Sequence, residues 1–142
     1  MRSFFRKKEG EAGAPRAPAA TLATVLVVDD SPTETHIFSE ALNRAGFQVE
    51  TAANGQEGVD AARRLRPDLI LMDVVMPVLN GFQATRQLQR DPQTADIPVI
   101  MVTTKDQETD RTWGMRQGAM DYLVKPVNTD DLVARIRTVL NV

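Results

Sequence analysis

The sequence predicts an α/β fold in which a parallel sheet of five strands is wound on both faces by five helices. Apolar runs of strand length alternate with amphipathic segments of helical length five times along the 142 residues. The apolar runs lack a polar and apolar alternation, which is typical of strands covered on both faces. Parallel neighbours need crossovers, and the helical segments stand where crossovers are required. A chain of this length is expected to form one domain.

The first unit is a strand over residues 25–28 followed by a capped helix. We expect Ser31 to cap the helix, Pro32 to occupy its first position and Glu34 to close a capping box with Ser31. Gly46 marks the end of this helix. A strand, a polar loop and a capped helix form the opening of a βα unit.

The same order repeats four more times, with turn residues or proline between the units. We predict further strands over residues 47–52, 68–73, 98–102 and 122–124, and further helices over residues 56–65, 82–90, 106–117 and 129–140. The chain ends with the last of these helices, so we expect no attached output or DNA-binding domain.

Residues 1–23 differ in composition from the rest of the chain. A basic start that contains Phe4 and Phe5 precedes a stretch rich in Ala, Gly and Pro. Such a stretch buries too little apolar surface to fold alone, so we expect a disordered basic tail and linker before a domain over residues 24–142. The two Phe side chains and their neighbouring cations also suggest weak docking to an anionic membrane surface or to a partner.

Composition excludes several classes of function. The chain has no Cys and a single His, His36, which rules out thiolate metal sites, Cys nucleophiles and His clusters. Residues 24–142 carry 12 basic and 17 acidic side chains, and this acidic body argues against nucleic acid as a partner. No apolar run approaches the roughly 20 residues of a membrane span, and the N-terminus lacks the apolar core of a signal peptide. We therefore expect a cytoplasmic protein.

Polar residues stand at the carboxyl ends of the predicted strands. They are Asp29 and Asp30 after the first strand, Asp73 after the third, Thr103 after the fourth and Lys125 after the fifth. In open α/β sheets these ends share one edge, and ligands bind there. A lone Asp often only ends a strand. Three carboxylates repel one another unless a positive charge joins them, and oxygen ligands suit a hard divalent cation, so the set predicts a Mg²⁺ site.

These residues also suit phosphoryl transfer to a carboxylate. A carboxylate can attack phosphorus to form an acyl phosphate, while positive charge stabilises the phosphoryl oxygens. Asp73 is the expected phosphoacceptor, and we expect Thr103 and Lys125 to contact the phosphate. Asp30 and Asp73 are expected to hold the metal, with Asp29 acting partly through water.

At these positions the sequence resembles the response regulator receiver family, the CheY-like domains of two-component phosphorelay signalling. The matching motifs are Val28-Asp29-Asp30-Ser31, Leu71-Met72-Asp73-Val74-Val75-Met76-Pro77 with Asn80-Gly81, Val102-Thr103-Thr104 and Tyr122-Leu123-Val124-Lys125-Pro126. The resemblance implies the flavodoxin-like strand order 2-1-3-4-5 and phosphorylation of Asp73 by a CheA-like histidine kinase. It also implies a metal ligand from the backbone carbonyl of Val75 and a cis peptide between Lys125 and Pro126.

Within this family the chain is most similar to the single-domain PilH-type regulators of type IV pilus twitching motility. The similarity lies in residues 29–34, 80–88 and 103–110. It implies a role in pilus-driven or chemotaxis-like motility. The tail over residues 1–23 is a departure, because such short regulators need not have one.

Two positions are expected to report phosphorylation to a partner. Thr103 would turn its hydroxyl toward a phosphoryl group on Asp73, and Tyr122 would move inward into the vacated space. The resemblance implies that the face containing Tyr122 meets an output protein, whose identity the sequence leaves open. Trp113 and Arg116 are further candidates for this partner face, since Trp and Arg are enriched in interface hot spots. The alternative for Trp113 is half-buried packing against the sheet.

Two other functions stay open at this point. Phosphatases of the haloacid-dehalogenase type also use an aspartyl phosphate and Mg²⁺, but they look for a second acid two residues after the nucleophile, where this chain has Val75. Without a nearby base we expect no rapid turnover, and hence a signalling domain that catalyses only its own phosphorylation and dephosphorylation. A phosphorylation-independent scaffold is the other alternative, against which the complete set of acids argues.

Overall fold

The computed structural model describes residues 23–142, so the tail expected before Thr24, with its proposed docking role, lies almost wholly outside the described residues. Strands and helices alternate strictly along the described chain. They are β1 (Thr24–Val28), α1 (Pro32–Arg44), β2 (Gln48–Ala52), α2 (Gly55–Leu65), β3 (Leu69–Met72), α3 (Gly81–Arg90), β4 (Val99–Thr103), α4 (Glu108–Gln117), β5 (Asp121–Val124) and α5 (Thr129–Leu140). Every predicted element is confirmed within two residues at each end.

The largest difference between the predicted and the observed elements is the start of α4, which begins at Glu108 and not at residue 106. The backbone N–H of Lys105 donates to the Thr103 hydroxyl oxygen (3.4 Å), and that of Gln107 donates to the Asp110 carboxylate (3.2 Å). These side-chain bonds satisfy the backbone in a non-helical form and delay the first turn. The loop before α4 is thereby tied to the end of β4.

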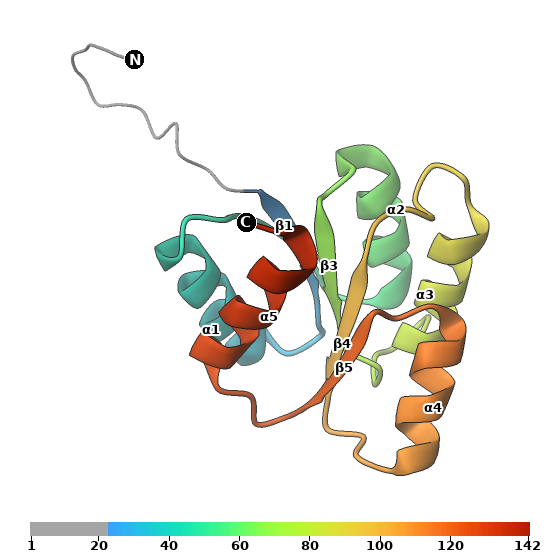
Figure 1. Cartoon of the computed structure of the whole chain (residues 1–142). Coiled ribbons are helices and arrows are strands. Elements are labelled where there is room, and N and C mark those ends of the chain that lie inside the picture. Colours follow the sequence, from blue (N-terminus) through green and yellow to red (C-terminus); the bar gives the residue numbers. More distant parts are fainter. Residues whose placement is uncertain (1–22) are drawn as a thin grey trace, which may run out of the picture.

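The five strands are all parallel and lie in the order β2-β1-β3-β4-β5. This confirms the predicted doubly wound, flavodoxin-like sheet. Helices α1 and α5 cover one face, and α2, α3 and α4 cover the other (Figure 1). The register pairs Val28 with Met72 and Met72 with Met101, so the central strands end at the same level. The residues that follow these strands are therefore brought together.

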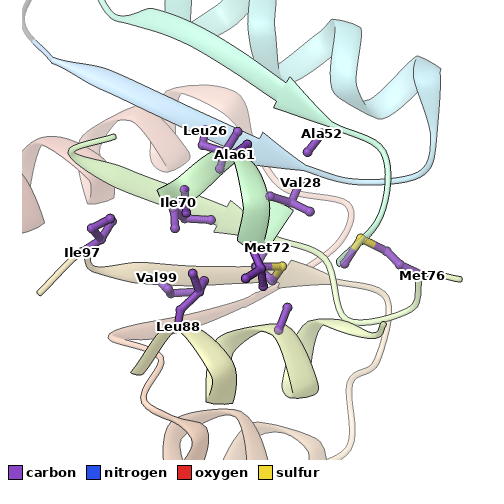
Figure 2. Close-up of a cluster of buried hydrophobic side chains, with 13 residues drawn as sticks. Leu26, Val28, Ala52, Ala61, Ile70, Met72, Met76, Leu88, Ile97 and Val99 are labelled. Carbon is purple, nitrogen blue, oxygen red and sulfur yellow. The ribbon is translucent and has the colours of Figure 1, made fainter. Parts of the chain in front are cut away.

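Two apolar layers hold the sheet between its helices. On the α2 and α3 face, Leu26, Val28, Ile70 and Met72 pack together, as Figure 2 shows. The alternate strand residues point to the layer below α1 and α5. Full burial of one such large side chain contributes about 2 kcal/mol. None of the helices in residues 23–142 has the length and hydrophobicity that crossing a bilayer requires.

Candidate functional site at the carboxyl edge of the sheet

Acidic side chains meet where β1 and β3 end. Asp29 directly follows β1 and Asp73 directly follows β3. Both backbones continue the strand ladder: the N–H of Asp29 donates to the Ala52 carbonyl (3.1 Å), and that of Asp73 donates to the Val28 carbonyl (3.0 Å). Both residues are buried, whereas Asp30 is exposed. The sheet therefore holds the carboxylates of Asp29 and Asp73 in buried positions at its carboxyl edge, and leaves that of Asp30 exposed beside them.

Lys125 joins the two buried carboxylates. Its Nζ lies 2.8 Å from Oδ2 of Asp29 and 3.4 Å from Oδ2 of Asp73. Only 11% of the Lys125 side chain is exposed, so these pairs act in a medium less polar than bulk water. The peptide between Lys125 and Pro126 is cis, which confirms the expectation from the family resemblance.

Asp73 is oriented by backbone donors from the loop that follows it. Its Oδ1 accepts the N–H of Val74 at 2.7 Å, with the N–H of Val75 farther away at 3.4 Å. Gly81, the first residue of α3, closes this loop, and a Cβ atom there would lie 2.1 Å from the Asp73 carbonyl oxygen. The loop can pack this tightly because Gly81 has no side chain. One Asp73 oxygen is thus held by the backbone while the other faces Lys125.

The charges of this cluster shift one another's pKa values. Burial raises the pKa of the Asp73 carboxyl; Lys125 opposes the rise and Asp29 adds to it, while Thr103 and the Val74 N–H also oppose it. Burial alone would lower the pKa of Lys125, but its hydrogen bond to Asp29 and the charges of Asp73, Asp29 and Glu34 outweigh burial and raise that pKa. The arrangement therefore keeps Lys125 protonated beside a carboxyl that is costly to charge.

Three carboxylates offer a candidate site for a cation. Asp29, Asp30 and Asp73 each present an oxygen, and these oxygens all lie within 4.8 Å of one another. Three oxygen donors, two of them buried, match the ligand preference of a hard divalent ion that keeps some of its waters. Val75, the fourth predicted ligand, lies in the adjoining loop with its side chain exposed. A cleft of about 510 Å³ opens beside these acids, lined in part by Asp29, Asp30 and Glu57.

The capping box predicted for α1 is wrong, and its acid belongs to the site instead. The Ser31 hydroxyl accepts the Glu34 N–H as expected (3.2 Å), but the Ser31 N–H donates to Oδ1 of Asp29 (2.9 Å). With that donor taken, the Glu34 side chain lies 3.7 Å from Nζ of Lys125. Sequence reasoning missed Glu34 as a site residue. The sequence signal for this arrangement is Asp29, an acid two residues before Ser31 that can compete with Glu34 for the Ser31 N–H.

Thr103 and Tyr122 lie on the neighbouring strands. Thr103 is fully buried at the end of β4, beside Asp73. Tyr122 is also buried, and its hydroxyl donates to the Lys105 carbonyl at 2.8 Å. The Arg111 guanidinium lies 5.4 Å from the centre of the Tyr122 ring and donates to the Tyr122 carbonyl at 3.1 Å. Tyr122 is therefore already directed inward in this structure, whereas the sequence predicts an inward movement on phosphorylation.

The three residues expected on the partner face, Trp113, Arg116 and Tyr122, differ in their exposure to solvent. Trp113 is 46% exposed on α4, and Arg116 is exposed on the same helix. Tyr122 offers no comparable surface, because only 1% of it is exposed. His36 is exposed on α1, where its ring lies 3.7 Å from Glu40. The structure thus gathers the acids with Thr103 and Lys125, and places Trp113 and Arg116 elsewhere.

The parallel sheet and the acidic pocket at its carboxyl edge indicate the class to which this protein belongs. The family described as the response regulator receiver domain matches residues 25–137. The chain belongs to this family, whose members are signalling domains of two-component phosphorelays. It is 58% identical to the protein PilH of Pseudomonas aeruginosa over 119 residues, which cover 84% of this chain and 98% of PilH. The predicted resemblance is confirmed at both levels.

Solved structures agree with this assignment. The Vibrio cholerae chemotaxis protein CheY4 superposes with a TM-score of 0.79 and 37% identity, over 84% of this chain and 99% of CheY4. The receiver domain of a Pseudomonas aeruginosa sensor histidine kinase gives a TM-score of 0.79 and 31% identity, over 84% of this chain and 98% of that domain. That second structure holds a magnesium ion in its active site cleft.

Proposed function

We propose that residues 24–142 form a single-domain response regulator that accepts a phosphoryl group on Asp73 from a histidine kinase, with Mg²⁺ as cofactor. The observation that carries this proposal is the bridge from Lys125 to Asp29 and Asp73, at 2.8 and 3.4 Å. A protonated amine between an acceptor carboxylate and a second acid suits a phosphoryl group, whose oxygens need positive charge. The protein would act in the cytoplasm, through an output protein that binds one phosphorylation state.

The transfer uses residues whose positions are fixed by the sheet. Oδ2 of Asp73, the oxygen not held by the Val74 N–H, forms the new bond to phosphorus while the bond from phosphorus to the kinase histidine nitrogen breaks. That nitrogen keeps the electron pair and takes a proton from solvent. Lys125 then pairs with a phosphoryl oxygen, and the Thr103 hydroxyl donates to another. A Mg²⁺ ion held by Asp29, Asp30, Asp73 and the Val75 carbonyl would neutralise charge on the phosphoryl oxygens.

Catalysis is limited in this proposal to the protein's own phosphorylation and dephosphorylation. An aspartyl-phosphate phosphatase needs a general acid or base beside the leaving group. The position two residues after Asp73 holds Val75, whose exposed side chain cannot transfer a proton. Glu34 supports this limit, since its carboxylate lies 3.7 Å from Lys125 and is engaged by that charge.

Intact mass spectrometry after incubation with acetyl phosphate and Mg²⁺ tests the proposal. We expect one added phosphoryl group in the wild-type protein and none in Asp73→Asn, which keeps the size and loses the nucleophile. Asp96→Asn, an exposed Asp far along the chain, is the matched control and should be phosphorylated normally. Continued release of product from many phosphoesters would contradict a signalling role.

The motility role follows from similarity to PilH and is tested in cells. Expression of this chain in a bacterium that lacks its own PilH should restore the twitching zone on agar, and the Asp73→Asn variant should not. Equal restoration by both variants would favour a scaffold that works without phosphorylation. Failure of both, with the two proteins present at normal levels, would contradict the motility role.

A further inference from the structure

A cleft of about 390 Å³ lies between α3 and α4, away from the acidic site. Its lining residues are Arg86, Gln89, Arg90, Trp113, Arg116 and Gln117. The two helices run side by side on one face of the sheet (Figure 1). Gln89 packs against the end of α4, since a Cβ atom on Gly118 would lie 2.5 Å from the Gln89 Cγ. The cleft is therefore formed by packed helices.

The charge of this cleft is opposite to that of the surrounding body. Three of its six lining residues are arginines, and none is acidic. Within residues 23–142, Arg86, Arg90 and Arg116 take part in no ion pair, while other arginines on the surface do. Residues 24–142 as a whole carry five more acidic than basic side chains. Three exposed guanidinium groups gathered without a counter-charge favour an anionic ligand.

Trp113 adds an apolar contact to this cationic cleft. Trp113 is 46% exposed and lines the same cleft as the arginines of α3 and Arg116 of α4. An exposed Trp beside arginines is the composition found in interface hot spots, because both side chains bury large areas and still form polar contacts. Gln89 and Gln117 supply amide groups that can pair with the backbone of a bound segment. The lining therefore offers charge, apolar surface and neutral hydrogen bonds together.

We propose that this cleft docks an acidic peptide segment of the output protein, with carboxylates on the arginines and an apolar side chain on Trp113. The proposal rests on the proposed signalling function and names the chemistry of its partner. A nucleotide fits less well, because the lining residues come from the C-terminal halves of α3 and α4, where no free backbone N–H groups of a helix N-terminus are present to hold a phosphate. The guanidinium groups must then supply all the positive charge, as they do when they bind carboxylates of a peptide. A nucleic acid would extend from this small cleft over the acidic body.

The position of α4 links this cleft to Tyr122. Gly114, the neighbour of Trp113, faces the sheet, and a Cβ atom there would lie 2.9 Å from Cδ2 of Tyr122. Arg111 of the same helix contacts the Tyr122 ring and carbonyl. The Lys105 N–H donates to the Thr103 hydroxyl oxygen, and the Lys105 carbonyl accepts the Tyr122 hydroxyl. If Thr103 turns toward a phosphoryl group, this loop loses its contact with Thr103, and α4, which packs on Tyr122, can shift with Trp113 and Arg116. Phosphorylation of Asp73 is then expected to change the affinity of the cleft.

Binding of a labelled acidic peptide, followed by fluorescence anisotropy, tests the proposal on the full-length protein. The probe is an acetylated and amidated helical peptide with glutamates four residues apart and leucines beside them; the control peptide has glutamine in place of every glutamate. Trp113 is the only Trp of the chain, so its emission should also change on binding. We expect saturable, salt-sensitive binding of the glutamate peptide and binding at least about tenfold weaker for the glutamine peptide.

Variants locate the binding site. Arg86→Gln, Arg116→Gln and Trp113→Ala should each weaken the peptide severalfold, and the two arginine changes together by at least about tenfold. Arg64→Gln on α2, an exposed arginine outside the cleft, is the matched control and should bind as wild type. Equal loss in Arg64→Gln, full binding by the cleft variants, or displacement of the peptide by lower concentrations of ADP would each overturn the proposal.

Peptide binding measured before and after phosphorylation distinguishes failure of the docking site from failure of the phosphoacceptor assignment to Asp73. Acetyl phosphate with Mg²⁺ should change the peptide affinity of the wild type and leave that of Asp73→Asn unchanged. Peptide affinity that is identical before and after a verified phosphorylation overturns the cleft as the output site. Specific peptide binding by a protein that acetyl phosphate never modifies supports the docking site and overturns the phosphoacceptor assignment.

Discussion

The two charged regions of this molecule are built in opposite ways. At the carboxyl edge of the sheet, Lys125 is 11% exposed and lies between Asp29 and Asp73, so buried charges of both signs are already paired. In the cleft between α3 and α4, three exposed arginines share a surface without an acid. A buried cluster must satisfy its own charges to fold, whereas an exposed one can leave them for a partner. Substitutions should therefore affect stability in the first region and binding in the second.

The largest effect is expected from Lys125→Ala. It leaves Asp29 and Asp73 buried side by side without their cation, which should lower the free energy of unfolding by about 3 kcal/mol in a urea titration. Addition of Mg²⁺ should restore part of this loss, because the ion supplies positive charge to the same carboxylates. Lys105→Ala removes a lysine that is 46% exposed and should cost about 0.5 kcal/mol or less. Equal losses for the two lysines would contradict the comparison.

Tyr122, between the two regions, should make stability fall in alkaline solution. Burial raises its pKa from 10.0 to about 12, with a smaller rise from Asp110. The unfolded chain then loses the phenol proton at a lower pH than the folded chain, so unfolding becomes more favourable as the pH rises from 10 toward 12. The effect amounts to about 3 kcal/mol across that window.

Thermal unfolding at a series of pH values checks this expectation. Tyr122→Phe removes the phenol and should show a shallower alkaline decline, at the cost of about 1 kcal/mol near neutral pH for the lost bond to Lys105. Lys125 also contributes to the decline, because the stability that comes from its raised pKa is present below pH 10.5 and is lost as the pH rises through its value in the folded protein. Parallel curves for the wild type and Tyr122→Phe would exclude Tyr122 as a source.

Gly114→Ala tests the contact between α4 and the sheet. The added methyl group would lie 2.8 Å from Sδ of Met101 and 2.9 Å from Cδ2 of Tyr122, so these side chains or α4 itself must shift. We expect a loss of about 2 kcal/mol in unfolding free energy and weaker binding of the acidic peptide. Thr112→Ala, on the exposed side of α4, is the control for helix propensity. An Ala variant as stable as the wild type would show that this contact is loose.

The smallest effect on stability is expected for Arg116→Gln. The guanidinium has no ion-pair partner within residues 23–142, and its removal relieves repulsion from the other arginines of the cleft. The free energy of unfolding, measured by urea titration, should stay the same or rise slightly, by about 0.3 kcal/mol. Peptide affinity should fall in the same sample. A loss of stability comparable to that of Lys125→Ala would show that Arg116 serves the fold and not a partner.

The sequence by itself determined the strands, the helices and the edge at which the site forms. Apolar runs without alternation specify buried parallel strands, and the residue after each run, such as Asp29 or Asp73, must then lie at the common carboxyl edge. These are consequences of local periodicity and of chain direction, both of which are written along the chain. The gathering of Asp29, Asp30, Asp73, Thr103 and Lys125 follows from them without any distance being known.

Tertiary structure alone decided which side chains from different elements and loops meet. Glu34 lies beside Lys125 because Asp29 takes the Ser31 N–H that a capping box would use. Tyr122 points inward because the Lys105 carbonyl accepts its hydroxyl and Arg111 covers its ring. Arg86 and Trp113 share a cleft because α3 and α4 pack as neighbours. Competition among hydrogen-bond partners and the packing of helices set these contacts, and neither leaves a periodic signal in the sequence.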